Sequence, residues 1–380
     1  MECGLDTSIS RHFAVLPDPR VDRCKLHKLI DIVTITICAV ISNADGWEDI
    51  EAYAHAKEEL LRTFLDLPNG IPSHDTIERV FARLDPAAFQ AVFLSWVSEI
   101  RVKLPGDVVA IDGKTLRGSR DIPIDRSPIH MLSAWCSENE LVLGQLRTAD
   151  KSNEITAIPL LLDILDIAGC IVTIDALGCQ TAIAEKIIQK EADYVIACKG
   201  NQEFLHEDIA ALFTAELQQP TEQTAMAYHQ TIDEHHGRRE VREYWSTDHL
   251  AGLRTRDRWA GLQSVAMVRS ERQTNAGTSI ETRYYISSLP KDAQKTAHAI
   301  RAHWTIENRL HWVLDVVLHE DDSRTRSDHT AQNLSVIRHV TLNMLRQETS
   351  LKKSLRQKRL RAGWDDEYML KVIRVEPQQT

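Results

Sequence analysis

Hydrophobic positions follow two different spacings along the chain, and the spacing changes near residue 106. In the first hundred residues it is helical: residues 50–64 are rich in Ala, Glu and Leu, and Pro68-Asn69-Gly70 ends that run. A second helix is predicted from the N-cap Ser73 to Pro86. Its apolar stripe, spaced i, i+3, i+4 and i+7, consists of Ile77, Val80, Phe81 and Leu84. Residues 1–100 are therefore predicted to be mostly helical.

These two helices and the turn between them also fit a helix-turn-helix that reads DNA. The open face of the second helix carries His74, Asp75, Glu78, Arg79 and Arg83. Because its acidic side chains repel phosphates, an ordinary helical hairpin is the simpler explanation, and both interpretations stay open.

From Gly106 onward, short β-like runs alternate with helical ones. Strands are predicted over residues 108–111, 129–136, 141–147, 170–174 and 194–198, and helices over 154–167 and 181–190. The order βββαβαβ predicts an α/β fold in which three antiparallel strands and two right-handed crossovers form one mixed sheet.

A polar stretch with scattered β-like runs follows, near residues 237–245, 264–269 and 282–287, and indicates a strand-rich insertion. A long helix is then predicted from Ala293 to His319. Its apolar stripe consists of Ile306, Leu310, Val313, Leu314 and Val317.

Charge changes the picture in one place. The 380 residues carry a formal net charge of −10, which argues against a protein that coats nucleic acid by bulk attraction. Between Ser323 and Trp364, however, ten Lys or Arg residues stand against two Asp or Glu, so a basic segment follows an acidic body. A solvated helix face is the alternative explanation for this segment.

Other classes are excluded by composition. The longest apolar run, Leu29–Ile41, is too short to span a bilayer, and the N-terminus lacks the pattern of a secretory signal, so a cytoplasmic protein is expected. Seven scattered cysteines without a CxxC suggest neither a disulfide framework nor a thiolate zinc site.

Two aspartates are the first candidates for chemistry. Asp112 ends the first predicted strand and Asp175 ends the fourth, and these strands can be neighbours in a sheet of this order. With Glu307 on the final helix they would supply the oxygen ligands that two divalent ions need. A strand-end Asp that merely caps the next turn is the plain alternative for either residue alone.

Basic residues follow the first aspartate directly. In Asp112-Gly113-Lys114-Thr115-Leu116-Arg117-Gly118-Ser119, the Lys114 and Arg117 side chains are suited to neutralise a phosphodiester. His303, Glu307 and His311 share one face of the final helix, which leaves a zinc hydrolase as a further alternative, although the other histidines (His229, His235 and His236) lie in the polar insertion.

Long segments resemble DDE-class insertion-sequence transposases, in particular the H-repeat-associated branch. They include VVAIDGKTLRGS (108–119), LVLGQLRTADKSNEITAIPLLLDILDIAGCIVTIDALGCQ (141–180), ADYVIACKGNQ (192–202), YYISSLP (284–290) and HWTIENRLHWVLDVVLHED (303–321). The resemblance implies an RNase H-like fold, catalytic and metal-binding Asp112, Asp175 and Glu307, and Mg²⁺ as the cofactor with Mn²⁺ as a substitute. It also implies double-stranded DNA ends and target DNA as partners, no membrane, and a homo-oligomer on DNA.

The resemblance also suggests how the chain is divided. The expected segments are an N-terminal helical, DNA-associated domain (1–100), a first part of the catalytic core (106–204), a strand-rich insertion (205–282), a last part of the core with Glu307 (283–345) and a basic C-terminal tail (346–380).

One departure from the family affects the DNA contacts. Related transposases often carry Tyr, Arg and Lys around the glutamate, whereas this chain has His303 and Leu314 at two of these positions. The DNA-end contacts are therefore assigned to other basic residues, namely Arg301, Arg309, Arg324 and Arg326, beside Lys114 and Arg117. The expected activity is cleavage of the element's ends and transfer of the 3′-hydroxyl. The alternatives are a domesticated DNA-binding protein and a metal-dependent endonuclease.

Overall fold

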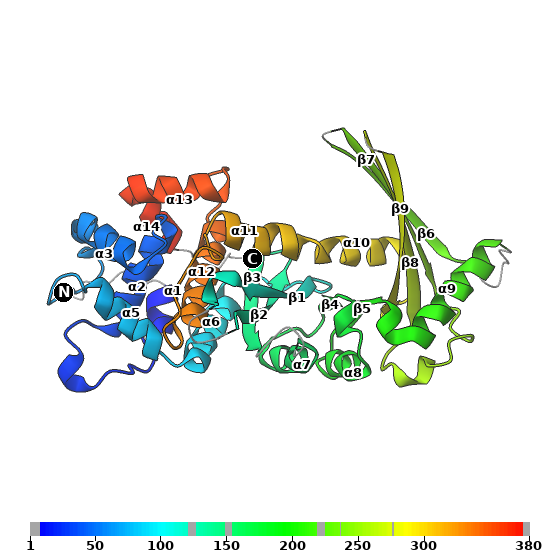
Figure 1. Ribbon diagram of the computed structural model, residues 1–380, viewed down its shortest axis with the longest axis horizontal. Coiled ribbons are helices and arrows are strands. Elements are labelled where there is room, and N and C mark those ends of the chain that lie inside the picture. Colours follow the sequence, from blue (N-terminus) through cyan, green and yellow to red (C-terminus); the bar gives the residue numbers. More distant parts are fainter. Residues whose placement is uncertain are drawn as a thin grey trace. The chain divides into compact units, whose positions relative to one another are not determined.

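The protein is a mixed α/β chain of two compact units in a computed structural model that describes residues 8–120, 127–148, 154–218, 225–235, 237–275 and 277–374 (Figure 1). The first unit comprises residues 1–103, 113–151 and 307–380, and the second comprises 104–112 and 152–306. This division cuts across the five expected segments, which stay a prediction about function. In the described part of the chain, no helix is long and apolar enough to cross a membrane.

Helices dominate the first unit. Its N-terminal helices are α1 (Ser8–Phe13), α2 (Leu29–Ile41), α3 (Trp47–Ala56), α4 (Glu58–Leu61), α5 (His74–Arg83) and α6 (Pro86–Ile100). The predicted cap is confirmed, because the Ser73 hydroxyl accepts the backbone N–H of Thr76. Pro86 occupies the first turn of α6, where its missing N–H costs nothing, so the hydrophobic pattern continues into a further helix.

Three C-terminal helices complete this unit: α12 (Thr330–Gln347), α13 (Leu355–Trp364) and α14 (Asp366–Ile373). The buried helix α12 packs against α2, α5 and α6. The expected basic tail is thus folded over residues 355–373. Lys358 and Arg359 are buried because their side chains donate to backbone carbonyls, Lys358 to Leu345 (2.8 Å) and Arg359 to Val40 (2.9 Å).

Strand β1 (Val108–Leu116) passes from the second unit into the first between Asp112 and Gly113. In the first unit the strand order is β3 (Leu141–Thr148), β2 (Ile129–Cys136), β1, and β2 and β3 pair antiparallel. The prediction that the first strand ends before Asp112 is wrong, because the polar stretch Gly113–Leu116 continues it.

In the second unit β1 and β5 (Asp193–Cys198) lie on either side of β4 (Ile171–Ile174), and all three strands are parallel. The predicted alternation is confirmed by α7 (Glu154–Ile164) and α8 (Thr181–Gln189), which pack against each other. The insertion extends this sheet in the order β9-β8-β7-β6, with β9 antiparallel to β5. These strands are β6 (Ala227–His235), β7 (Arg238–Thr247), β8 (Ser264–Thr274) and β9 (Gly277–Ser287), and α9 (Glu203–Gln218) precedes them.

The predicted final helix is interrupted. It consists of α10 (Ala293–His303), which packs on β4 and β5 within the second unit, a π-helical turn η8 (Ile306–His311), and α11 (Trp312–Val316). The predicted apolar stripe is nevertheless confirmed, since all five of its side chains are buried. A π turn shifts the helical register by one residue, so side chains on either side of it do not share one face as the i, i+4 spacing predicts.

Candidate functional site

The two aspartates leave adjacent parallel strands at the same level of the second unit. Ile111 of β1 pairs with Ile174 of β4, and Asp112 and Asp175 are the next residues on the two strands. Asp175 is exposed and Asp112 is half-buried. The Asp175 Oδ1 atom accepts the backbone N–H groups of Leu177 (3.0 Å) and Gly178 (3.4 Å), so this carboxylate also caps a turn, as the plain alternative expects.

Two side-chain amides hold the turn that follows Asp175. Asn201 Nδ2 donates to the carbonyl of Ala176 (2.7 Å), and Gln202 Nε2 donates to that of Cys179 (2.8 Å). Both amides come from the segment after β5, and the sequence interpretation assigned them no role. The signal was present, because the polar Gly200-Asn201-Gln202 follows a buried strand whose end meets the same sheet edge.

His303 lies behind this turn. Its Nδ1 atom is 3.1 Å from the Thr173 hydroxyl, two residues before Asp175. Burial lowers the pKa of His303, against the opposing charge of Asp175, so the ring is neutral near pH 7. Glu307 is exposed and belongs to the first unit.

The structure describes no group of three or more His, Cys, Asp or Glu side chains arranged to hold a metal ion within the ranges it covers. The zinc alternative gains no support from His303, because its ring contacts the Thr173 hydroxyl. His236, one of the histidines of the polar insertion, lies outside the described residues.

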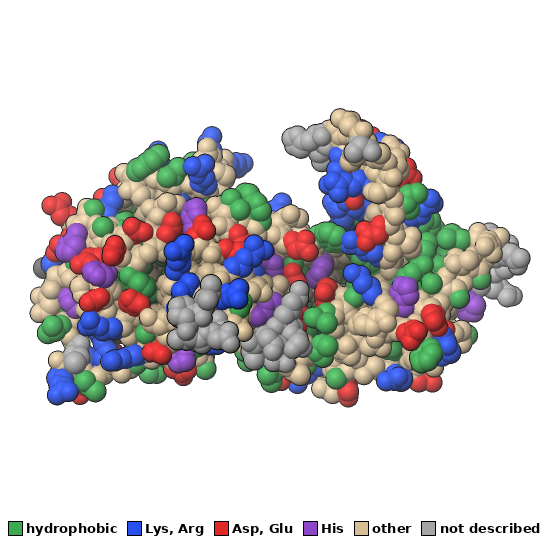
Figure 2. All heavy atoms as spheres, viewed as in Figure 1, with side chains coloured by type: hydrophobic (Ala, Val, Ile, Leu, Met, Phe, Trp, Pro, Cys, Tyr) green, Lys and Arg blue, Asp and Glu red, His purple; other side chains and the backbone are tan. Residues whose placement is uncertain are grey.

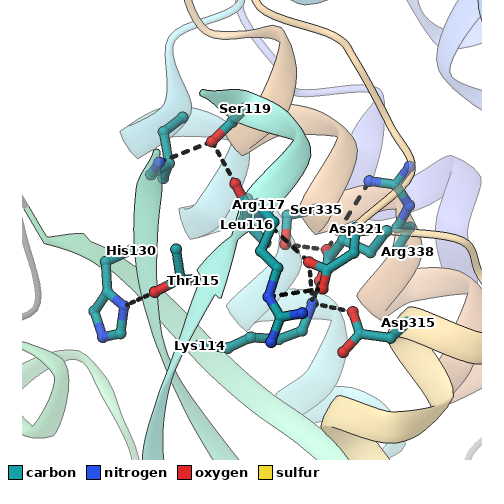
Figure 3. Close-up of polar contacts among 12 residues, drawn as sticks. Lys114, Thr115, Leu116, Arg117, Ser119, His130, Asp315, Asp321, Ser335 and Arg338 are labelled. Atoms are coloured by element: carbon teal, nitrogen blue, oxygen red, sulfur yellow. Dashed lines mark hydrogen bonds and ion pairs between the residues drawn. The ribbon is translucent and has the colours of Figure 1, made fainter. Parts of the chain in front are cut away.

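A polar cluster in the first unit surrounds Lys114 (Figure 3). The Lys114 Nζ atom lies 2.6 Å from Asp315 Oδ1, 2.7 Å from Glu320 Oε2 and 3.6 Å from Asp321 Oδ1. Only 9% of the Lys114 side chain is exposed. Burial lowers the pKa of Lys114, but the attraction of Glu320 and Asp315 outweighs it and the pKa is raised. This ammonium is engaged by carboxylates rather than turned to solvent.

Glu320 is the centre of that cluster. Its Oε1 atom accepts the Ser335 hydroxyl (3.1 Å) and lies 3.9 Å from the Arg338 guanidinium. Burial raises the pKa of Glu320, but the charges of Lys114 and Arg338 outweigh burial and lower this pKa to about 2. Burial also lowers the pKa of His339 to about 4, so Glu320 is ionised and His339 is neutral at pH 7.

The other basic residues predicted to bind DNA differ in exposure. The Arg117 side chain is 82% exposed and its Nε atom lies 3.5 Å from Asp321 Oδ2. Arg301 is exposed beside Asp233 (3.2 Å), and Arg309 is exposed and paired with Glu140. Arg324 is exposed, whereas Arg326 is half-buried and donates to the Gly118 carbonyl (3.4 Å).

Basic side chains on the outer part of β7–β9 are interspersed with acidic ones (Figure 2). Arg239 pairs with Glu234 (3.1 Å), and Arg283 pairs with Glu281 (2.8 Å). Strands β7–β9 carry six arginines and four glutamates, so ion pairs neutralise part of their positive charge.

In this mixed α/β sheet two carboxylates lie at the same level of adjacent parallel strands, Asp112 within β1 and Asp175 directly after β4, and they define a candidate acidic site. Family comparison names its class. A model described as "Transposase DDE domain" matches residues 103–344, and one described as "DDE_Tnp_1-associated" matches residues 10–97. The chain belongs to the DDE-domain transposase family.

Curated relatives agree. The chain is 42% identical over 375 residues to "Putative transposase YncI" of Escherichia coli O157:H7, which covers 96% of this chain and 94% of the relative. It is also 42% identical over 371 residues to "H repeat-associated putative transposase YhhI" of Escherichia coli K12, covering 96% and 97%. The predicted resemblance to the H-repeat-associated branch is thus confirmed. Among solved structures, a piggyBac transposase synaptic complex with hairpin DNA aligns with a TM-score of 0.36 at 11% identity, covering 98% of this chain and 82% of that one.

Proposed function

We propose that this protein is a DNA transposase that cleaves the ends of its insertion sequence and transfers the freed 3′-hydroxyl to target DNA. Asp112 and Asp175 are its catalytic carboxylates, Glu307 is the third, and the core around them is RNase H-like. The observation that carries the proposal is the register of β1 and β4, which brings the first two carboxylates to one sheet edge. Glu307 is included because of the family resemblance.

The donor set fits Mg²⁺, because carboxylate oxygens are the ligands this hard cation prefers. Asp175 is exposed, and its Oδ1 atom is oriented by two backbone N–H groups, so the carboxylate is held before any ion arrives. A bound divalent ion, Mg²⁺ or Mn²⁺, would supply Lewis-acid activation of the attacking oxygen and stabilisation of the leaving one.

The chain's own groups have separate tasks in this proposal. The carboxylates would bind the divalent ions that contact the reacting phosphate. The side-chain amides of Asn201 and Gln202 hold the turn that follows Asp175. The exposed Arg117, Arg301, Arg309 and Arg324 contact DNA phosphates together with the half-buried Arg326. We leave Lys114 out of this set because three carboxylates engage its ammonium. Two DNA ends must be joined, so a homo-oligomer on DNA is part of the proposal.

The test is an assay on a plasmid that carries the DNA flanking the gene, with Mg²⁺ or Mn²⁺. Wild-type protein should cleave at the flanks and give joined products, whereas Asp112→Asn, Asp175→Asn and Glu307→Gln should bind DNA without cleaving it. Asp163→Asn, in an exposed pair with Lys186 on the surface of the same unit, is the matched control and should remain active.

Other outcomes separate the alternatives. Cleavage without joined products would indicate a metal-dependent endonuclease. Salt-sensitive DNA binding with no metal-dependent cleavage by the wild type would indicate a domesticated DNA-binding protein.

A further inference from the structure

The chain just after Asp112 is held against the chain that follows the Glu307 helix. Within the first unit, Lys114 contacts Asp315 of α11 and also Glu320 and Asp321 beyond it. The backbone N–H of Arg117 donates to Asp321 Oδ1 (3.3 Å). We call the four residues Lys114, Asp315, Glu320 and Asp321 the lysine clamp (Figure 3).

A close backbone approach supports the same attachment. A Cβ atom placed on Gly118 would lie 2.1 Å from the carbonyl oxygen of Ser323 and 2.8 Å from that of Asp321. No side chain fits there, so the glycine lets the two segments touch directly. The attachment therefore involves backbone packing as well as ion pairs.

The centre of the clamp is buried. The side chains of Lys114, Glu320 and Arg338 are 9%, 1% and 4% exposed, and Ser335 links Glu320 to Gln145 of β3 through hydroxyl contacts of 3.1 and 3.0 Å. Buried ion pairs stabilise a fold weakly compared with apolar packing, because desolvation offsets their attraction, but they tolerate little change in geometry. A buried lysine at this point is thus better suited to fixing a distance than to adding stability.

We propose that Lys114 is a positioning residue, which sets the distance between strand β1 just after Asp112 and the helical segment that begins with Glu307. Asp112 lies two residues before Lys114 on the same strand, and Asp315 lies on α11, which continues directly from the η8 turn that contains Glu307. Displacement of the Lys114 ammonium moves both attachments. The inference rests on the proposed function, since it concerns the same carboxylates.

The decisive variant is the double substitution Lys114→Met with Glu320→Gln. It removes the Lys114 ammonium together with the Glu320 carboxylate 2.7 Å away, so Glu320 is not left as a buried anion without its nearest cation. Arg338, which lies 3.9 Å from Glu320, keeps a neutral amide there, and the methionine cannot donate to Asp315. We expect a folded protein with DNA affinity within about two-fold of wild type and a cleavage rate at saturating DNA roughly 100-fold lower, the usual cost of about 1 Å of misplacement. Binding of Mn²⁺, followed by calorimetry without DNA, should weaken by about 10- to 100-fold.

Two further variants keep the test interpretable. Lys114→Arg retains the charge and should recover part of the cleavage rate and of the Mn²⁺ affinity. Lys186→Met, which removes a half-buried lysine paired with the exposed Asp163, is the control and should leave both measurements unchanged.

Wild-type cleavage and Mn²⁺ affinity in a folded double variant would overturn the inference and leave the cluster a purely stabilising one. Absence of cleavage by the wild type would instead count against the proposed function. The Mn²⁺ comparison between wild type and the double variant would still decide the role of Lys114.

Discussion

The chain segments that follow Asp112 and Asp175 are held in place by different kinds of interaction. After Asp112, the chain is fixed by a buried ammonium among three carboxylates. After Asp175, the chain is fixed by two neutral amides on backbone carbonyls, one from the exposed Asn201 and one from the half-buried Gln202. Equivalent positions in one sheet are thus secured once by charge and once by neutral hydrogen bonds.

The difference predicts different responses to substitution. A buried ion that loses its partner keeps its full desolvation cost, so a single substitution in the clamp should strongly destabilise the part of β1 that follows Asp112. Water can replace a solvent-accessible amide as a hydrogen-bond donor, so a single substitution should destabilise the turn after Asp175 only slightly. Changes that leave one buried ion of the first site without its partner should therefore lower stability as well as catalysis, and changes at the second site should appear mainly in catalysis.

The largest effect is expected from Lys114→Met alone. It leaves Glu320, which is 1% exposed, without its nearest cation, and should lower the free energy of unfolding by about 3–5 kcal/mol in urea titrations. The pair of the half-buried Lys186 and the exposed Asp163 provides the comparison, where Lys186→Met should cost less than about 1 kcal/mol. Similar costs at both lysines would mean that the clamp is not held by buried charge.

Acid should weaken the clamp region in two successive steps. The pKa of His339 is lowered from 6.5 to about 4, so the unfolded state binds a proton first and stability falls as the pH drops from 6.5 to 4. The pKa of Glu320 is lowered from 4.5 to about 2, so its contribution, present above pH 4.5, is lost between pH 4.5 and 2. Each step amounts to roughly 3 kcal/mol.

His339→Phe tests the first step, because the ring lies beside Phe93 (6.3 Å between centroids) and an apolar ring can replace it. Urea unfolding between pH 7 and 4 should then show a shallower pH dependence. It should not become flat, because burial also lowers the pKa of His311 to about 4. An unchanged slope would remove His339 from the explanation.

Much of this comparison could be anticipated from the sequence, but not the clamp. Alternating short apolar runs predict the succession βββαβαβ, in which the strands that carry Asp112 and Asp175 can be neighbours, and the structure pairs them. The sequence predicts that Lys114 contacts phosphate, because it follows the candidate catalytic Asp112 by two residues and can neutralise a phosphodiester. Its carboxylate partners lie about 200 residues further along the chain, and no local pattern reveals a pairing at that separation.

Charge counting did not reveal that two basic residues of the C-terminal segment are buried, and periodicity did not reveal the break in the final helix, for related reasons. The basic C-terminal segment was interpreted as surface, whereas Lys358 and Arg359 are satisfied by backbone carbonyls, which composition does not show. The apolar stripe of the final helix is compatible with a π turn, since all its members stay buried across the shifted register. In both places tertiary contacts decided what local spacing left open.

At the Asp175 turn a smaller effect is expected. Asn201→Asp replaces the donor to the Ala176 carbonyl by an acceptor of nearly the same shape, so the hydrogen bond becomes a repulsion. Stability should change by only about 1 kcal/mol, while the Mg²⁺ concentration needed for half-maximal cleavage should rise about 10-fold. Gln189→Glu, beside Glu185 on α8, is the matched control and should not change the Mg²⁺ requirement. An unaffected Asn201→Asp would show that the amides do not position the carboxylate.

The smallest effect should come from Arg117, which differs from Lys114 mainly in exposure. Its side chain is 82% exposed against 9% for Lys114, so only the arginine is available to a phosphate without breaking the clamp. Arg117→Ala should weaken binding to DNA of any sequence and reduce the slope of log affinity against log salt by about 1. Arg256→Ala, at an exposed arginine of the second unit, should leave that slope unchanged. Equal slopes for wild type and Arg117→Ala would show that Arg117 makes no phosphate contact. Lys114 and Arg117 would then differ in burial but not in DNA binding.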